Sequence, residues 1–270
     1  MEELQRIWLR KKVMNKLKYS LALGRPSLGT WIQIPHPSIV EIIANSANDN
    51  LDWICIDMEH GSIGVESMTD LIRTISGCGL TPFVRIPKND YVWIHRVLDA
   101  GARGLFIPMI KNRIEAEEAV SEVLYPPEGK RSFGYSRANL YGENFIRAVH
   151  DANDEISIVL QIEDKEAINH LNDILNVKNF DGTFIGPYDL SGSIGKPGDF
   201  KNAEYKLALS HYMDRSKVYD ISMGIHIVRP TREKIKKAVN DGYKIIAIGT
   251  DAVFLEEKCN EVLGEINELL

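Results

Sequence analysis

Apolar residues along this chain gather into short, near-continuous runs, and the segments between most of these runs place apolar residues at helical spacing. Near-continuous runs are typical of parallel strands that are buried on both faces. Strands that alternate with helices predict an α/β fold with a parallel sheet. The eight candidate strands are 28–34, 52–58, 81–86, 104–109, 156–163, 182–187, 222–228 and 244–250.

Helical periodicity is clearest in segments 38–47, 91–98 and 165–175, where apolar residues recur at i, i+3 and i+4. Eight strands with intervening helices favour a closed (β/α)8 TIM barrel over an open doubly wound sheet. No GxGxxG motif follows the first strand, which counts against a dinucleotide-binding fold. A length of 270 residues suits one such barrel, so we expect a single domain over 1–270.

The two ends of the chain lie outside the repeating pattern. Residues 6–18 carry six Lys or Arg residues and no acid, and they predict a surface helix within an N-terminal extension over 1–20. The apolar stretch of a signal peptide is missing here, because lysines interrupt it. Apolar residues within 252–270 form a stripe that predicts a C-terminal helix. The sequence leaves open whether Met1 or Met14 is the start of the protein.

Composition narrows the classes of function. The chain is 44% hydrophobic and 26% charged, as is ordinary for a globular protein. A net charge of −6 and the lack of a dense basic stripe count against a nucleic-acid partner. No apolar run approaches the roughly 18 residues of a membrane span. Three cysteines without a CxxC pair predict no disulfide framework, so we expect a cytoplasmic protein.

Candidate chemistry lies where the predicted strands end, because a TIM barrel draws its catalytic groups from the carboxyl ends of its strands. Glu163 and Asp189 follow neighbouring strands. Two carboxylates suit a hard divalent cation such as Mg²⁺ or Mn²⁺. A cation left open on one side can chelate a 2-oxo acid and stabilise its enolate as a Lewis acid. Other polar residues at these ends are Asp57, Glu59, His60, Arg85, Gln161, His226 and Arg229.

Enolate chemistry also needs a proton acceptor and a cationic group near the developing charge. His60 can serve as the base, and Arg85 can hold the oxyanion. Spacing alone leaves other readings open, because rim carboxylates serve many chemistries. On spacing alone, Glu163 and Asp189 would more often be helix-capping or salt-bridged carboxylates, and His60 would as often be a hydrogen-bonded rim histidine.

Six segments resemble the HpcH/HpaI aldolase family, which comprises class II pyruvate aldolases related to the citrate lyase β-subunit. The likeness runs from about residue 16 to the end of the chain. It implies a metal-dependent carbon–carbon lyase that reversibly cleaves a 4-hydroxy-2-oxo acid to pyruvate and an aldehyde. The segments are IDMEHG (56–61), FVRIP (83–87), GARGLFIPMI (101–110), YPPEGKRSFG (125–134), LQIEDKEAINHLNDIL (160–175) and DGTFIGPYDLSGSIG (181–195).

The resemblance also implies roles for the matching residues. Glu163 and Asp189 would bind the metal, which would be Mg²⁺ or Mn²⁺, with Co²⁺ as a further option. His60 would be the catalytic base, with Asp57 behind it to orient or tune it, and Arg85 would bind the pyruvate oxygen. The implied substrate-binding residues are Gln161 and the backbone amides around Gly186, Pro187 and Tyr188.

Two features depart from the family pattern and bear on the second substrate. The loop RSFGYSRANLYG (131–142) differs in its middle, and His226 stands where relatives tend to have an apolar residue. We hypothesise that His226 and Arg137 favour a polar or anionic aldehyde. Trp31 and Gln33, at the end of the first strand, either line the pocket or belong to the barrel core.

The resemblance further implies a homohexamer, a trimer of dimers, with C-terminal helices exchanged between subunits. Two alternative functions stay open. The first is a citrate-lyase-like acyl-CoA lyase, although no basic patch for coenzyme A is evident near the rim. The second is a non-catalytic binding protein on the aldolase scaffold, which the intact set of candidate catalytic residues counts against.

Overall fold

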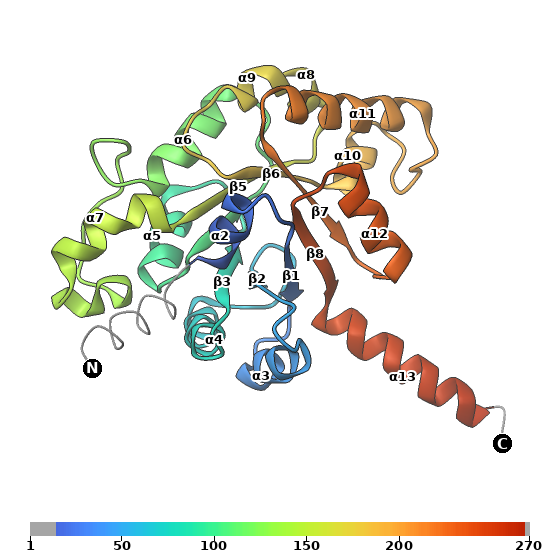
Figure 1. Ribbon diagram of the computed structural model, residues 1–270, viewed down its shortest axis with the longest axis horizontal. Coiled ribbons are helices and arrows are strands. Elements are labelled where there is room, and N and C mark those ends of the chain that lie inside the picture. The colour runs from blue at the N-terminus through green and yellow to red at the C-terminus, as the bar shows by residue number, and fades with distance from the viewer. Residues whose placement is uncertain (1–14, 268–270) are drawn as a thin grey trace.

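The structure, a computed structural model, describes residues 15–267. Its strands form one closed parallel barrel in sequence order, with β8 paired back to β1 (Figure 1). The prediction of a (β/α)8 TIM barrel is therefore confirmed. The strands are β1 (Ser27–Ile32), β2 (Trp53–Asp57), β3 (Thr81–Arg85), β4 (Gly104–Ile107), β5 (Ser157–Ile162), β6 (Gly182–Ile185), β7 (Ser222–Ile227) and β8 (Ile245–Thr250).

Helices connect successive strands and surround the barrel (Figure 1). Several begin at a side chain that accepts a backbone N–H: Asp90 accepts from Val92 and Asn112 from Glu115. The helices are α2 (Lys16–Ala22), α3 (Pro37–Ser46), α4 (Val65–Gly77), α5 (Tyr91–Asp99), α6 (Arg113–Val123), α7 (Phe145–Glu155), α8 (Lys165–Asn169), α9 (Leu171–Leu175), α10 (Pro187–Ser193), α11 (Ala203–Val218), α12 (Arg232–Asp241) and α13 (Asp251–Asn267), with the 3₁₀ helix η1 (Arg137–Gly142).

Aromatic side chains fill the inside of the barrel. Two of the rings pack directly on glycines. A Cβ atom on Gly29 would lie 2.0 Å from the Trp53 ring, and one on Gly104 would lie 2.1 Å from the Phe83 ring. Glycine is therefore required at both positions. Because this core leaves no open lumen, a substrate site must lie on the end of the barrel. The interior cluster consists of Leu17, Trp31, Trp53, Cys55, Phe83, Phe106, Val159, Phe184, Ile245 and Ala247.

Helix assignments differ from the sequence-based expectations in two segments. The helix predicted over 165–175 is two short helices, α8 and α9, which meet at His170. The connection 125–155, which includes the loop 131–142, contains η1 and the whole of α7. Since this connection runs from a helix to the next strand, it lies at the amino end of the strands.

The ends of the chain match the predicted helices in part. Helix α2 covers the end of the predicted N-terminal extension, and residues 1–14 lie outside the described residues. Helix α13 extends away from the barrel (Figure 1), with Leu255 57% and Leu263 58% exposed. Exchange of this helix between subunits, and the hexamer, stay predictions. Among residues 15–267, no helix is long and apolar enough to cross a membrane.

Candidate active site

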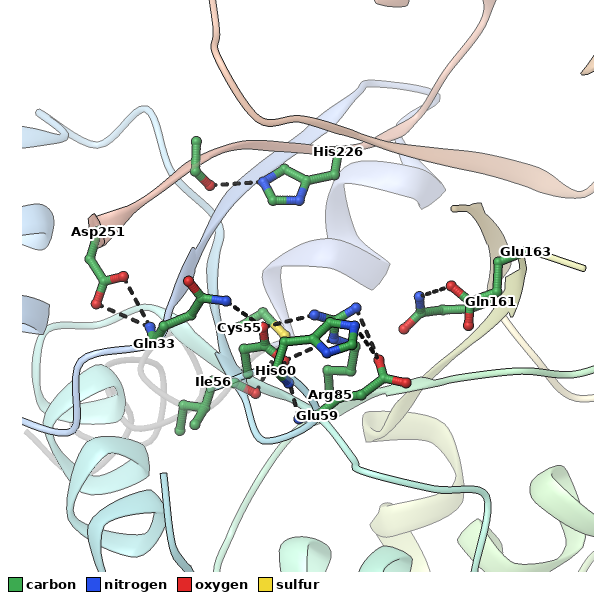
Figure 2. Close-up of polar contacts among 12 residues, drawn as sticks. Gln33, Cys55, Ile56, Glu59, His60, Arg85, Gln161, Glu163, His226 and Asp251 are labelled. Carbon is green, nitrogen blue, oxygen red and sulfur yellow. Dashed lines mark hydrogen bonds and ion pairs between the residues drawn. The ribbon is translucent and has the colours of Figure 1, made fainter. Parts of the chain in front are cut away.

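Most of the predicted polar residues lie at the carboxyl ends of the strands, and Figure 2 shows several of them: Glu59, His60, Arg85, Gln161, Glu163 and His226. Asp57 and Arg85 are the last residues of β2 and β3, and the strand register places them directly side by side. Glu163 follows β5, and Asp189 lies in the first turn of α10, directly after β6. Parallel strands end at the same edge, so these side chains come together although they are far apart in sequence.

Asp57 holds Arg85 through two hydrogen bonds. Arg85 Nε donates to Asp57 Oδ1 at 2.9 Å, and Nη2 donates to Oδ2 at 2.7 Å. Asp57 is only 1% exposed. Burial alone would raise its pKa, but the hydrogen bonds and charge of Arg85 outweigh burial and leave the pKa below its usual value. The pair is therefore a fixed ion pair with planar, bidentate geometry.

His60 and Glu59 occupy the loop that follows β2. Asp57 Oδ1 accepts the backbone N–H groups of both residues at 3.2 Å, so its contact with His60 is to the backbone. Glu59 Oε2 lies 3.0 Å from Arg85 Nη1 and 3.9 Å from His60 Nε2. The structure thus places Asp57 beneath the backbone of His60, and Glu59 is the carboxylate nearest the ring. The His60 side chain is 60% exposed and open to a ligand.

Trp31 forms the floor beneath Arg85. The Arg85 Cζ atom lies 4.3 Å from the centroid of the Trp31 ring, within the range of a cation–π contact. The ring of His226 stacks on Trp31 with centroids 5.3 Å apart and planes 11° apart. Trp31 is 2% exposed, so it belongs to the barrel core and supports the site from below.

Glu163 is a buried carboxylate held from two sides. Its Oε1 accepts the Met109 N–H at 2.8 Å, and its Oε2 accepts Gln161 Nε2 at 2.9 Å. Gly186 leaves room for it, since a Cβ atom there would lie 2.6 Å from Glu163 Oε2. Burial raises the pKa of Glu163 to about 7, and the nearby charges of Glu59 and Asp189 add to the rise. The Glu163 carboxyl group is therefore buried close to two other acidic side chains, Glu59 and Asp189.

The donor set around Glu163 fits a hard divalent cation. Asp189 is exposed, and its charge lies close enough to Glu163 to raise the pKa of that residue. The Oε1 atom of Gln161 is buried and has no hydrogen-bond partner within the described chain. Between residues 15 and 267, no group of three or more His, Cys, Asp or Glu side chains is placed to hold a metal. Two carboxylates match a cation such as Mg²⁺, which keeps several water or substrate oxygens.

The start of α10 offers fewer free amides than the sequence implied. The Gly186 N–H already donates to Ile162 O at 3.2 Å, and Pro187 has no N–H. Tyr188 and Asp189 follow in the first helical turn, where backbone N–H groups lack partners within the helix. The amides available to a substrate carboxylate are therefore those of Tyr188 and Asp189.

The two residues expected to recognise the aldehyde lie apart. Arg137 Nη1 donates to Ala100 O at 3.1 Å, at the amino end of β4, so within one chain it lies at the opposite end of the barrel. His226 lies beside the site, with its Nε2 2.9 Å from Gly249 O. Burial lowers the pKa of His226 to about 4. The ring is therefore neutral, donates through Nε2 and keeps Nδ1 as an acceptor.

The sequence did not predict the contacts of two site residues, Glu59 and Gln33. Glu59 was a neighbour in the segment IDMEHG, and its ion pair with Arg85 depends on the shape of the loop after β2. Gln33 donates its side-chain Nε2 to Asp57 Oδ2 at 2.9 Å. The position of Gln33 follows from the pairing of β1 with β2. Because Ile32 pairs with Ile56, the residues that follow them, Gln33 and Asp57, are neighbours.

We expect the cation-free protein to lose stability as pH rises from about 4.5 to about 7. The pKa of Glu163 in the folded state lies above the ordinary value of 4.5, so in this window the folded state binds more protons than the unfolded state. The loss approaches about 3 kcal/mol if the whole shift is expressed. Melting temperatures in EDTA across this range check it. Glu163→Gln should flatten the curve, and an unchanged slope in that variant would contradict the assignment.

Comparison with known proteins places the chain among aldolases. The family model described as HpcH/HpaI aldolase/citrate lyase matches residues 28–256. A 4-hydroxy-2-oxo-heptane-1,7-dioate aldolase from Salmonella heidelberg (strain SL476) is 34% identical over 242 residues, 89% of this chain and 90% of that protein.

Two solved structures share the fold over nearly the whole chain. A HpcH/HpaI aldolase/citrate lyase family protein from Burkholderia cenocepacia J2315 has a TM-score of 0.87 and 27% identity, covering 94% of this chain and 100% of its own. The citrate synthase SbnG has a TM-score of 0.84 and 28% identity, covering 94% and 98%. These matches confirm the predicted family and, at the level of the family, the expected carbon–carbon lyase: the chain belongs to the HpcH/HpaI aldolase/citrate lyase family.

Proposed function

We propose that this protein is a divalent-cation-dependent aldolase that reversibly cleaves a 4-hydroxy-2-oxo acid to pyruvate and an aldehyde. One observation carries the proposal. The carboxylates of Glu163 and Asp189 lie at the same end of the barrel as the Arg85 guanidinium, which Asp57 holds in a fixed orientation. The 34% identity to a named aldolase over most of the chain supports the same reaction class.

Glu163 and Asp189 would hold the cation, with Mg²⁺ or Mn²⁺ as the expected ions and Co²⁺ as a further option. When bound, such a cation supplies Lewis-acid polarisation of the 2-oxo acid. Gln161 keeps Glu163 in place through its Nε2 donation at 2.9 Å. Its free Oε1 is then available to the substrate or to a water molecule.

Arg85 is suited to stabilising the enolate oxygen. Its guanidinium has five N–H groups, of which two donate to Asp57 and one faces Glu59. Two remain for a ligand, and their direction is fixed before the substrate arrives. Preorganised donors of this kind stabilise developing charge more than mobile ones do.

His60 would act as the base. It would take the proton of the substrate 4-hydroxyl, directly or through water, as the C3–C4 bond breaks and its electron pair becomes the enolate of pyruvate. The aldehyde leaves, and protonation of the enolate at C3 gives pyruvate. The amides of Tyr188 and Asp189 would hold the substrate carboxylate at the start of α10. This sequence of steps needs no Schiff-base lysine.

Pyruvate release from 4-hydroxy-2-oxo acids, followed with lactate dehydrogenase and NADH, tests the proposal. We expect cleavage with Mg²⁺ or Mn²⁺, loss of activity in EDTA, and recovery when the cation is returned. Full activity in chelator would contradict the role of the cation. An acyl-CoA lyase would instead act on a CoA thioester and leave these substrates intact, and a binding protein would act on neither.

For the aldehyde, we propose a polar, hydroxyl-bearing partner recognised by His226. The hypothesis of an anionic aldehyde loses its support, because His226 is neutral and Arg137 lies at the other end of the chain's own barrel. The free Nδ1 of His226 can accept a hydrogen bond from a hydroxyl group. We expect His226→Leu to lower the preference for glyceraldehyde over propionaldehyde about tenfold in the synthetic direction, the value of one hydrogen bond. An unchanged ratio of kcat/KM values would discard the idea.

A further inference from the structure

The network that fixes Arg85 extends to Gln33, a residue that the proposed reaction does not use. Gln33 directly follows β1, and the register that pairs Ile32 with Ile56 brings it beside Asp57. Its Nε2 donates to Asp57 Oδ2 at 2.9 Å. The same oxygen accepts Arg85 Nη2 at 2.7 Å (Figure 2). Gln33 and Arg85 therefore share one carboxylate oxygen.

Gln33 is itself held in place by a second carboxylate. Its backbone N–H lies 3.0 Å and 3.1 Å from the two oxygens of Asp251, and the Ile34 N–H donates to Asp251 Oδ2 at 2.9 Å. Asp251 is 5% exposed and begins helix α13. Figure 2 shows Gln33 between Asp251 on one side and Arg85 on the other. The side-chain amide is thus aimed at Asp57 by a buried anchor.

The two oxygens of Asp57 are unequally supported. Oδ1 accepts Arg85 Nε and the backbone N–H groups of Glu59 and His60. Oδ2 accepts Arg85 Nη2 and the Gln33 amide. Without Gln33, Arg85 would be the one remaining donor to Oδ2 among these contacts. A buried carboxylate oxygen that loses a donor is left unsatisfied at a cost in free energy, which favours any rotation of the carboxylate, and of the guanidinium bound to it, that recovers a partner.

We propose that Gln33 is a positioning residue: it fixes the plane of the Asp57 carboxylate and thereby the direction in which Arg85 presents its two free N–H groups. The inference rests on the proposed aldolase reaction, in which those groups meet the enolate oxygen. It assigns Gln33 no contact with the substrate. It also gives Asp251, at the junction of β8 and α13, the task of aiming Gln33.

The chemistry of the side chain gives a sharp test. Gln33→Met keeps the length of the side chain and removes the donor at every pH. Gln33→Glu supplies a donor only while the introduced carboxyl group is protonated. Once ionised, that group faces the carboxylate of Asp57, while Asp251 accepts the backbone N–H of the same residue and Arg85 is the one cation sharing the Asp57 oxygen. Asn50→Asp makes the same amide-to-acid change at an exposed amide that donates to Ala47 O.

The measurement is kcat/KM for pyruvate release as a function of pH, with the cation present. At each pH the kcat/KM of the variant is divided by that of the wild type. Gln33→Met should lie about tenfold below the wild type at every pH, mainly through kcat. Gln33→Glu should approach the wild type at about pH 5.5 and fall at least about tenfold as pH rises. Asn50→Asp should stay level. Affinity for oxalate, a planar mimic of the enolate, should follow the same order.

Two results would overturn the inference: a Gln33→Glu ratio that stays flat across pH, or a Gln33→Met variant with wild-type kcat/KM and oxalate affinity. Melting temperatures within about 4 °C of the wild type show that the variants are folded. A wild type that releases no pyruvate would refute the proposed function instead. The oxalate titrations would then still decide whether Gln33 positions Arg85.

Discussion

Arg85→Lys is expected to lower kcat/KM for cleavage of a 4-hydroxy-2-oxo acid by about a hundred- to a thousandfold, the cost of losing a preorganised oxyanion donor. Lysine keeps the charge, but its single ammonium group cannot fill both oxygens of Asp57, reach Glu59 and still face the substrate. The loss should fall mainly on kcat, because the enolate charge develops after binding. Steady-state kinetics with saturating cation measure it.

Arg113→Lys is the matched control for this prediction. Arg113 pairs with Glu117 on the exposed surface of α6, where an ion pair contributes little. Its replacement should leave kcat and KM close to the wild type. If Arg85→Lys also stayed within about threefold of the wild type, a fixed arginine fork would not be part of the mechanism.

Glu163→Gln and Asp189→Asn should each lower activity by at least about a thousandfold, with no rescue by added Mn²⁺ up to moderate excess. Each change keeps the size of the side chain and removes one of the two charges expected to hold the cation. Glutamine at 163 can still accept the Met109 N–H, so the local fold should persist. Pyruvate release at increasing Mn²⁺ checks this expectation.

Asp164→Asn is the control next in sequence to Glu163. Asp164 caps α8 by accepting the Glu166 N–H, a role that asparagine also fills, and it pairs with Lys111 near the surface. Activity and cation dependence should therefore stay near the wild type. Robust activity in either Glu163→Gln or Asp189→Asn would show that the cation, if required, is held elsewhere.

The barrel could be predicted closely from the sequence because its strands are buried on both faces. Each predicted run overlaps a strand of the structure, and the overrun at several carboxyl ends covers residues such as Glu163 that belong to the rim. Aligned strand ends also made it possible to group Asp57, Arg85, Glu163 and Asp189 before their contacts were known.

The errors have physical causes. Arg137 was grouped with the site because its loop, 131–142, departs from the family pattern, but that loop follows helix α6, and loops that follow helices lie at the amino end of a TIM barrel. The helix N-terminus at Gly186 was expected to offer its amides, but the Gly186 N–H continues the barrel ladder to Ile162. The charge state of His226 depends on burial and on Gly249, which no spacing pattern reports.

The central claim is that Glu163 and Asp189 together hold a divalent cation beside Arg85. Titration calorimetry of Mn²⁺ into the cation-free wild type, Glu163→Gln, Asp189→Asn and Asp164→Asn tests it without relying on turnover. One site is expected in the wild type and in Asp164→Asn, with affinity at least about tenfold weaker in the other two variants. Equal Mn²⁺ affinity in all four proteins would contradict the account.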